Sequence, residues 1–384
     1  MGLLLATVAL VATALQSHAA APSRDLAATP KQPQTLYASP SGTIDAFAQD
    51  GSLLAWFAPS AKGCNSVRLL SLTDGAQVSL PDESPTASNV TCQWTVVPPV
   101  RLALAQTDVL WTLRDSLSPL PFDYLLGAGY SDRRERRFKE IAHAGHGAGL
   151  WFGGLAGDSK VLRSQKEATL VFGVTAVAYV DEVACLSTRA CTMKIDRAYG
   201  GVYRIVGRKA PIRVPGTSGA LAVAVSGRSV AYIPTASVAS DGHPLASANL
   251  PVEVRDAQSG TLLASVVPKG TPLALALAPD VLALLEKTRA GMHVSWYDAA
   301  TGKLSGSVAV PSATSPELTA SDQLIVFRVG RSIRTANVAT HHVTTLTEAA
   351  GTPIGLSLEG TRLAWAENVG GRGRIRALFV AGRG

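Results

Sequence analysis

The sequence predicts an all-β protein built from repeated antiparallel sheets, and three observations support this prediction. Apolar residues make up 47% and charged residues 16% of the 384 residues, which fits a folded chain with much uncharged surface and argues against disorder. A short strand–turn–strand pattern recurs along the chain. An Asp-x-x-Ser/Thr-Gly turn follows that pattern in its clearest copies, so the repeating unit contains two hairpins.

The recurring pattern consists of an apolar stretch, a turn signal and a strand that ends in a large apolar residue. Measured at that residue, the copies lie roughly 50 residues apart, close to the length of about 40 to 50 residues for one propeller blade. Seven copies predict a seven-bladed β-propeller of four-stranded antiparallel blades. The copies are residues 50–56, 107–111, 168–179, 226–232, 279–284, 321–327 and 359–365.

The second hairpin is clearest in residues 252–262 and 294–304. An alternating stretch predicts an outer strand that is half exposed to water. In the turn that follows, Asp accepts hydrogen bonds from backbone amides ahead of it, and Gly accepts a positive φ. His341 and His342 occupy this turn in another copy, so we interpret them as a turn substitution.

The apolar strand, the Asp-Gly or Ser-Gly turn, the Val-Ala-Trp/Tyr strand and the Asp-x-x-Thr-Gly hairpin together resemble bacterial TolB-like and WD-repeat-like β-propellers, in particular uncharacterised exported ones. The resemblance covers residues 35–381. It implies the fold and a bacterial source but no activity, because this architecture hosts many unrelated functions. The third blade departs from the pattern through an insertion, which leaves the blade boundaries in residues 116–200 open.

A propeller ring must also close. The last copy supplies strands around residues 363–367 and 374–380, after which the chain ends before an outer strand can form. Residues 35–38 precede the first copy and are β-prone. We therefore predict that this N-terminal strand joins the last blade and closes the ring.

The chain is expected to have three parts. Residues 1–21 contain no charged residue and carry an apolar run followed by small residues, which predicts a signal peptide. A positive residue before that run is missing, so an uncleaved anchor or a different start is the alternative. Residues 22–34 read as a flexible linker and residues 35–381 as a single propeller domain, secreted or extracytoplasmic in the cell envelope.

No later stretch of the sequence approaches the ~18 to 20 apolar residues that a membrane-spanning helix requires. We therefore expect no transmembrane segment after the signal. We expect a monomer.

Four cysteines in an exported protein predict disulfides. Cys185 and Cys191 share one short polar segment and are paired on that ground. Cys64 and Cys92 then pair by default. Each bridge would contribute about 2 to 4 kcal/mol. A zinc site would need cysteine pairs two to four residues apart with further ligands, and neither spacing occurs.

Two basic clusters accompany the net charge of +7. Such clusters attract anions, although a solvated loop is the plainer interpretation. Glu135 lies inside the cluster that begins at Arg133 and reduces its positive charge. Export makes nucleic acid an unexpected partner. The weak anion-binding candidates are Arg133, Arg134, Arg136, Arg137, His143 and His146, and the second cluster is Arg372, Arg374, Arg376 and Arg383.

No local motif for catalysis, cofactor binding or metal binding stands out. His143 and His146 lack the i, i+4 spacing and the Glu of a metalloprotease helix. The chain contains neither a Gly-x-Ser-x-Gly elbow nor a phosphate-binding loop. Trp56, Trp111 and Trp365 occupy equivalent repeat positions and are expected to pack between blades. We therefore assign no catalytic, cofactor or metal residues.

These observations predict a non-enzymatic binding or protein-interaction scaffold for an unknown protein, glycan or small molecule. Loops on a rigid scaffold commonly carry function, so residues 116–137, 181–196 and 236–249 are the favoured regions. The alternative is a propeller enzyme, a lactonase-like hydrolase or a lyase, with a channel-mouth site built from several blades. Such a site leaves no local motif.

Overall fold

The structure is a computed structural model. It describes residues 32–59, 65–80, 212–238 and 244–380, together with the strands between residues 102 and 206 that are given below. Contacts divide the chain into Met1–Pro30 and the compact unit Lys31–Gly384, and the fold below is that of the second unit. The predicted signal peptide and almost all of the predicted linker lie outside the described residues.

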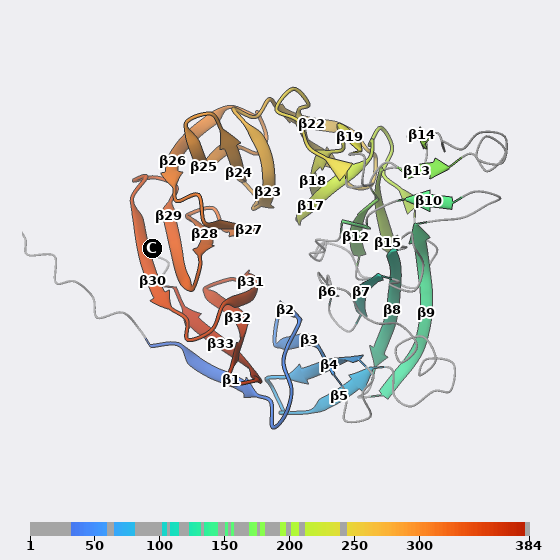
Figure 1. The fold of residues 1–384 in the computed structure, drawn as a ribbon, viewed down its shortest axis with the longest axis vertical. Helices are drawn as coiled ribbons and strands as arrows, with labels where there is room; N and C mark the ends of the chain where they lie inside the picture. Colours follow the sequence, from blue (N-terminus) through green and yellow to red (C-terminus); the bar gives the residue numbers. More distant parts are fainter. Residues whose placement is uncertain are drawn as a thin grey trace, which may run out of the picture. The chain divides into compact units, whose positions relative to one another are not determined.

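Within the described residues, every regular element is a strand of an antiparallel sheet (Figure 1). Five sheets have four strands with described side chains. In order from inner to outer strand they are β2 (Ala46–Asp50), β3 (Leu53–Pro59), β4 (Asn65–Ser71) and β5 (Gln77–Leu80); β17 (Ala220–Ser226), β18 (Ser229–Pro234), β21 (Val252–Asp256) and β22 (Leu262–Val266); β23 (Thr271–Leu277), β24 (Val281–Thr288), β25 (Gly291–Asp298) and β26 (Leu304–Val310); β27 (Thr314–Ala320), β28 (Leu324–Val329), β29 (Ser332–Asn337) and β30 (Val343–Glu348); and β31 (Pro353–Glu359), β32 (Arg362–Val369), β33 (Arg372–Phe379) and β1 (Gln34–Ala38).

Further sheets are described mainly by their strand pairing. Two have four strands, one has three strands and one is a two-stranded hairpin. They are β6 (Leu102–Ala105), β7 (Asp108–Arg114), β8 (Asp123–Ser131) and β9 (Arg134–Ala144); β11 (Leu155–Ala156), β12 (Thr169–Val174), β15 (Gly201–Val206) and β16 (Ile212–Arg213); β10 (Leu150–Phe152), β13 (Val177–Val180) and β14 (Met193–Asp196); and β19 (Ser237–Val238) with β20 (Pro244–Leu245).

This arrangement confirms an all-β propeller of four-stranded antiparallel blades. The repeat copies fall where expected, because residues 226–232 span the end of β17, its turn and β18, and residues 359–365 span the corresponding hairpin of β31 and β32. The copy at residues 168–179 differs from the prediction. Its two strands separate, since β12 pairs with β11 and β15 whereas β13 pairs with β10 and β14. Insertions around this copy supply the extra strands that pair with β13.

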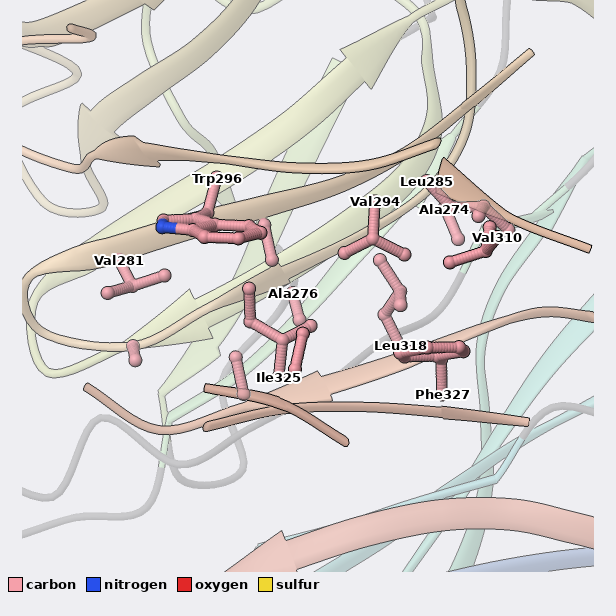
Figure 2. Packing of buried hydrophobic residues seen from close by; sticks show 14 of the residues in the cluster. Ala274, Ala276, Val281, Leu285, Val294, Trp296, Val310, Leu318, Ile325 and Phe327 are labelled. Carbon is pink, nitrogen blue, oxygen red and sulfur yellow. The ribbon is translucent and has the colours of Figure 1, made fainter. Parts of the chain in front are cut away.

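Neighbouring sheets pack face to face through their apolar side chains. Alternate residues of a strand point to opposite faces, so Val294 and Trp296 face the next sheet, where they join Ile325 and Phe327 in one buried cluster (Figure 2). Trp56 and Trp365 are likewise buried in clusters that each join two sheets, as expected from their repeat positions. The side chain of Trp111 lies outside the described residues.

Each blade has two distinct ends. We call the end with the turns between the first and second and between the third and fourth strands the hairpin end, and the opposite end, where one sheet connects to the next, the connection end. Neighbouring blades keep these ends aligned. At the hairpin end the amide of Asp280 donates to Oδ1 of Asp322 at 3.1 Å. At the connection end Nη1 of Arg331 donates to the carbonyl oxygen of Ala350 at 3.2 Å.

Strand β1 lies beside β33 as the fourth strand of its sheet (Figure 1). Thr35 pairs with Arg376, whose Nη1 donates to Oγ1 of Thr35 at 2.9 Å and whose Nη2 donates to the carbonyl oxygen of Pro33 at 2.5 Å. The ring of Tyr37 lies 4.4 Å from that of Trp56, measured between centroids. The β-prone segment at residues 35–38 therefore does form a strand, and its partner belongs to the last repeat.

His341 is the one non-glycine residue with positive φ among those described. Its φ is 59°, close to the 71° of Gly302 at the same turn position of the preceding blade. His341 also presents its ring edge-to-face with Trp296, at 5.0 Å between centroids. The substitution in this turn therefore combines backbone strain with an inter-blade contact.

We expect His341→Gly to be more stable than His341→Ala by about 1 kcal/mol, because both variants lose the ring contact but only Ala retains the strain of the left-handed conformation. Thermal unfolding of the two variants measures the difference. An alanine variant as stable as the glycine variant would contradict a strained turn at this position.

Candidate functional site

The first strand of each sheet lies beside the first strand of the next. Strand β17 contacts β23, β23 contacts β27, β27 contacts β31 and β31 contacts β2. Four inner strands each have a β-bulge near the connection end, in their pairing with the second strand of the same sheet. They are β17, β23, β27 and β31. A bulge turns a residue out of the regular ladder. The inner strands therefore begin with side chains displaced from the regular ladder. We call the starts of these strands, at the connection end, the mouth of the propeller, and their side chains the row.

Leu273, in the bulge of β23, is 40% exposed, whereas Leu221 of β17 and Ile354 of β31 are half-buried and pack against buried hydrophobic clusters. Pro316 of β27 is exposed. Beyond this row, β17 reads Ala-Leu-Ala-Val-Ala-Val-Ser and β23 reads Thr-Pro-Leu-Ala-Leu-Ala-Leu, so these two strands carry no charged side chain.

Asp45, immediately before β2, is one of two carboxylates near the starts of the inner strands. Its amide donates to the carbonyl oxygen of Phe57 at 2.9 Å, which fixes the backbone, and Oγ1 of Thr43 approaches its carboxylate at 3.5 Å. Asp45 keeps access to solvent, yet partial burial raises the pKa of its carboxyl group above the ordinary value of 3.8, against the smaller opposite effect of Thr43. A carboxyl with a raised pKa is one of the features of an acid–base group.

Glu317 supplies a second carboxylate at the start of β27. Its Oε2 accepts a hydrogen bond from Nε of Arg328 at 3.0 Å, and both side chains are partly buried. The pair joins the inner strand to the second strand of the same sheet. Glu317 therefore holds β27 in its bulged position.

Two buried carboxylates fix the connections between blades. Glu286, at the end of β24, accepts a hydrogen bond from the amide of Lys269 at 2.7 Å. Glu367, at the same position of β32, accepts one from the amide of Gly351 at 3.1 Å and one from Nε of Arg374 at 2.6 Å. Both carboxylates hold the chain just before it enters an inner strand.

This pair of anchors was not expected from the sequence, although the sequence carries a signal for it. Both connections read Gly-Thr-Pro, at residues 270–272 and 351–353, and in both a Glu ends the apolar part of the second strand. A Cβ at Gly270 would lie 2.4 Å from the carbonyl oxygen of Lys287, and one at Gly351 would lie 2.4 Å from that of Asn368. Alignment of the two copies would have revealed the shared Gly and Glu.

The carboxylates of the Asp-x-x-Ser/Thr-Gly turns also act locally, as predicted. Oδ1 of Asp256 accepts from the amide of Ser259 at 2.7 Å, and Oδ1 of Asp298 accepts from the amide of Thr301 at 2.7 Å. Hydrogen bonds from these residues hold the pKa of Asp256 and Asp298 below the ordinary value. Gly260 adopts a φ of 75°.

The sequence candidates for anion binding fall on the least described part of the chain. Arg134, Arg136, Arg137 and His143 belong to strand β9, which pairs with β8. The interpretation of these residues as a solvated loop is therefore wrong for the backbone. Their side chains, and Arg133 and His146 entirely, lie outside the described residues, so anion binding there stays a prediction.

The second cluster is divided by the structure. Arg374 donates a hydrogen bond to Glu367, and Arg376 donates one to Thr35. Arg372, at the start of β33, is exposed. Arg383 lies outside the described residues.

The four cysteines, Cys64, Cys92, Cys185 and Cys191, also lie outside the described residues, so their pairing stays a prediction. Of the favoured regions, residues 236–249 contain the small hairpin of β19 and β20, and residues 239–243 are not described. Within the described part of the chain, no group of three or more His, Cys, Asp or Glu residues could hold a metal ion. The same part contains no helix with the length and apolar character needed to span a membrane.

Comparison with known proteins gives likenesses of fold only. No protein-family model and no curated protein matches the chain. A chain of the mitotic checkpoint complex is similar to it with 12% identity and a TM-score of 0.47, over 97% of this chain and 98% of that chain. The computationally designed protein Ika8 has 12% identity and a TM-score of 0.46, over 89% and 85%.

BamB from Moraxella catarrhalis is similar with 11% identity and a TM-score of 0.42, over 89% of this chain and 85% of that chain. Such values say nothing about shared function. The assignment of the propeller therefore rests on the sheets of the chain itself.

Proposed function

We propose that this protein is an exported β-propeller that works as a non-enzymatic binding or protein-interaction scaffold. The supporting observation is how the described blades use their polar groups. Glu286, Glu367, Asp256 and Asp298 hold turns and connections, while the exposed side chain of Leu273 places an apolar group at the start of an inner strand. A rigid frame with an exposed apolar group at its mouth and variable turns suits contact with a partner.

The proposed architecture has seven blades, with β1 closing the ring. Support comes from the pairing of β6–β9 and of β11, β12, β15 and β16 into four-stranded sheets, in addition to the five sheets above. Strand β6 contacts β2 and β12, and β12 contacts β17. The proposal also includes the signal peptide at residues 1–21, an extracytoplasmic location and two disulfides.

Deletion of residues 33–40 tests the closure. It removes the hydrogen bonds of Arg376 to β1 and the contact of Tyr37 with Trp56. We expect a clearly lower melting temperature, because the deletion exposes the edge of β33 and part of a buried cluster. An unchanged melting temperature would refute closure by the N-terminal strand.

The binding function is tested by probing the full chain, Leu273→Asp and Leu262→Asp against a glycan array and a peptide array. Leu262 lies on the outer strand β22 and is 47% exposed, so it controls for a new carboxylate at an exposed leucine. We expect Leu273→Asp alone to lose the bound species, with the melting temperature of both variants unchanged. Equal loss in both variants, or no captured species, would count against a binding site at the mouth.

The alternative is an enzyme of the lactonase-like or lyase type, with Asp45, an exposed carboxylate immediately before the inner strand β2, as its candidate acid–base group. Asp45→Asn would then abolish turnover in a panel of lactone and ester substrates while Glu317→Gln changes it less, because Glu317 is paired with Arg328. Turnover that survives Asp45→Asn, or no turnover by the parent chain, would remove this alternative.

A further inference from the structure

Exposed cations gather at the connection end of three successive blades, formed by β23–β26, β27–β30 and β31–β33. Each of the three turns between the second and third strands contributes an arginine, and the connection into β23 and the end of β24 add lysines. All five residues are exposed. They are Lys269, Lys287, Arg289, Arg331 and Arg372.

Strand topology brings these residues together, although 103 positions separate Lys269 from Arg372 in the sequence (372 minus 269). Because strands of a four-stranded blade alternate in direction, every turn between second and third strands lies at the same end as the connections between blades. The hydrogen bond from Arg331 to Ala350 joins such a turn to the next connection.

Most carboxylates of this end in the three blades are buried or paired and so contribute little charge to the surface. Glu286 and Glu367 are buried and accept hydrogen bonds from the connections. Glu317 is paired with Arg328. Glu348, the last residue of β30, remains exposed. The solvent-facing charge of the connection end is therefore strongly positive.

The hairpin end of the same blades has the opposite character. Asp280 and Asp322 are exposed and Asp298 is partly exposed, and Lys303 is the exposed lysine or arginine among the residues described at this end of the three blades. The guanidinium of Arg362 is engaged by Oε1 of Gln49 at 3.0 Å and by the carbonyl oxygen of Gly51. The three blades thus carry positive charge at one end and negative charge at the other, which orients them in an external field.

Exposed aliphatic side chains lie among the cations. Val267, two residues before Lys269, is 69% exposed, and Val369, in the same turn as Arg372, is 38% exposed. Leu273, at the mouth, is 40% exposed. Cations mixed with exposed aliphatic groups are typical of surfaces that meet the headgroup region of a membrane.

We propose that the connection end of these three blades docks on an anionic phospholipid surface. The inference rests on the proposed binding function and names its partner. The cations are distributed over three turns, a connection and a strand end at one end of the propeller, and such an arrangement fits a broad surface of distributed negative charge. An acidic peptide is usually held in a groove or along a free strand edge. The acidic hairpin end then faces away from the membrane.

Vesicle co-sedimentation of the full chain tests this docking. We expect binding to vesicles of phosphatidylcholine mixed with phosphatidylglycerol, little binding to phosphatidylcholine alone, and a loss of binding as salt rises, because exposed charges are screened. Reversal of two turn-tip charges, Arg289→Glu with Arg372→Glu, should weaken binding by more than about tenfold. Neither arginine has an internal role assigned above.

The control is Arg228→Glu with Lys303→Glu, which makes the same change in net charge at the hairpin end and also removes the ion pair of Arg228 with Asp256. We expect it to leave vesicle binding unchanged. Both double variants are first checked for an unchanged melting temperature, and Arg289→Gln with Arg372→Gln replaces the first if it is unstable.

Equal weakening by the control pair, equal binding to neutral vesicles, or binding to polyglutamate but not to vesicles would each overturn the proposal. The array test, in which Leu273→Asp is expected to lose the bound species, does not depend on these arginines. Failure of membrane docking and failure of the general binding function are therefore distinguishable.

Discussion

Trp296→Ala is expected to lower the free energy of unfolding by about 3 to 5 kcal/mol, the cost of removing a large buried aromatic side chain. The indole is fully buried between the β23–β26 and β27–β30 blades, in the cluster of Figure 2. It lies against Gly306, where a Cβ would come within 2.2 Å of the ring, and meets His341 at its edge. A side chain that fills the space between two sheets leaves a cavity when truncated.

Urea unfolding followed by far-ultraviolet circular dichroism measures this loss as a lower midpoint at an unchanged m-value. Trp296→Phe is the control, because it keeps an aromatic ring in the cluster and should lose less. Gly306→Ala tests the same contact from the other side, and overpacking there should cost about 1 to 3 kcal/mol. A loss below about 1 kcal/mol for Trp296→Ala would contradict the packing of these two blades.

Arg374→Ala is expected to destabilise the protein by about 3 to 5 kcal/mol, because it leaves the Glu367 carboxylate buried without its cation. The side chain of Glu367 is 2% exposed and its Oε1 lies 2.6 Å from Nε of Arg374. The remaining hydrogen bond, from the amide of Gly351, neutralises no charge. The connection into β31 should loosen at the same time, since Glu367 holds it.

Arg372→Ala is the matched control, since Arg372 lies two residues earlier on the same strand and is exposed. Its effect should stay within about 0.5 kcal/mol. The double variant Glu367→Gln with Arg374→Met should recover part of the loss, because replacing both members of a buried pair removes the unpaired charge. Equal effects of Arg374→Ala and Arg372→Ala would show that the ion pair contributes nothing to stability.

The repeat made the fold predictable because its signals are local. A turn between two alternating strands fixes which residues face a neighbouring blade, as in residues 226–232 and 359–365. The Asp-x-x-Ser/Thr-Gly turns were equally readable, since Asp256 and Asp298 bond amides only two or three residues ahead. The copy at residues 168–179 was not, because its second strand, β13, pairs with inserted segments instead of with β12.

The candidate site was much harder to read from the sequence. The anchor of Glu286 bonds an amide 17 residues away, and Gln49 bonds the carbonyl oxygen of Arg362 across 313 residues. The sequence indicated Arg133–Arg137 because arginines are concentrated there. The described cations at the connection end are instead spread over a long stretch of the sequence. Proximity along the chain did not indicate which cations share a surface, because each blade of a propeller contributes one turn to the same end.

The sequence by itself determined most of the strands, their turns and the burial of Trp56 and Trp365, since alternation and turn chemistry act within a few residues. Only the tertiary structure decided which carboxylates would be buried as anchors and which charges would share one end of the blades. Those outcomes depend on the stacking and strand direction of blades distant in sequence, and a local pattern carries no information about either.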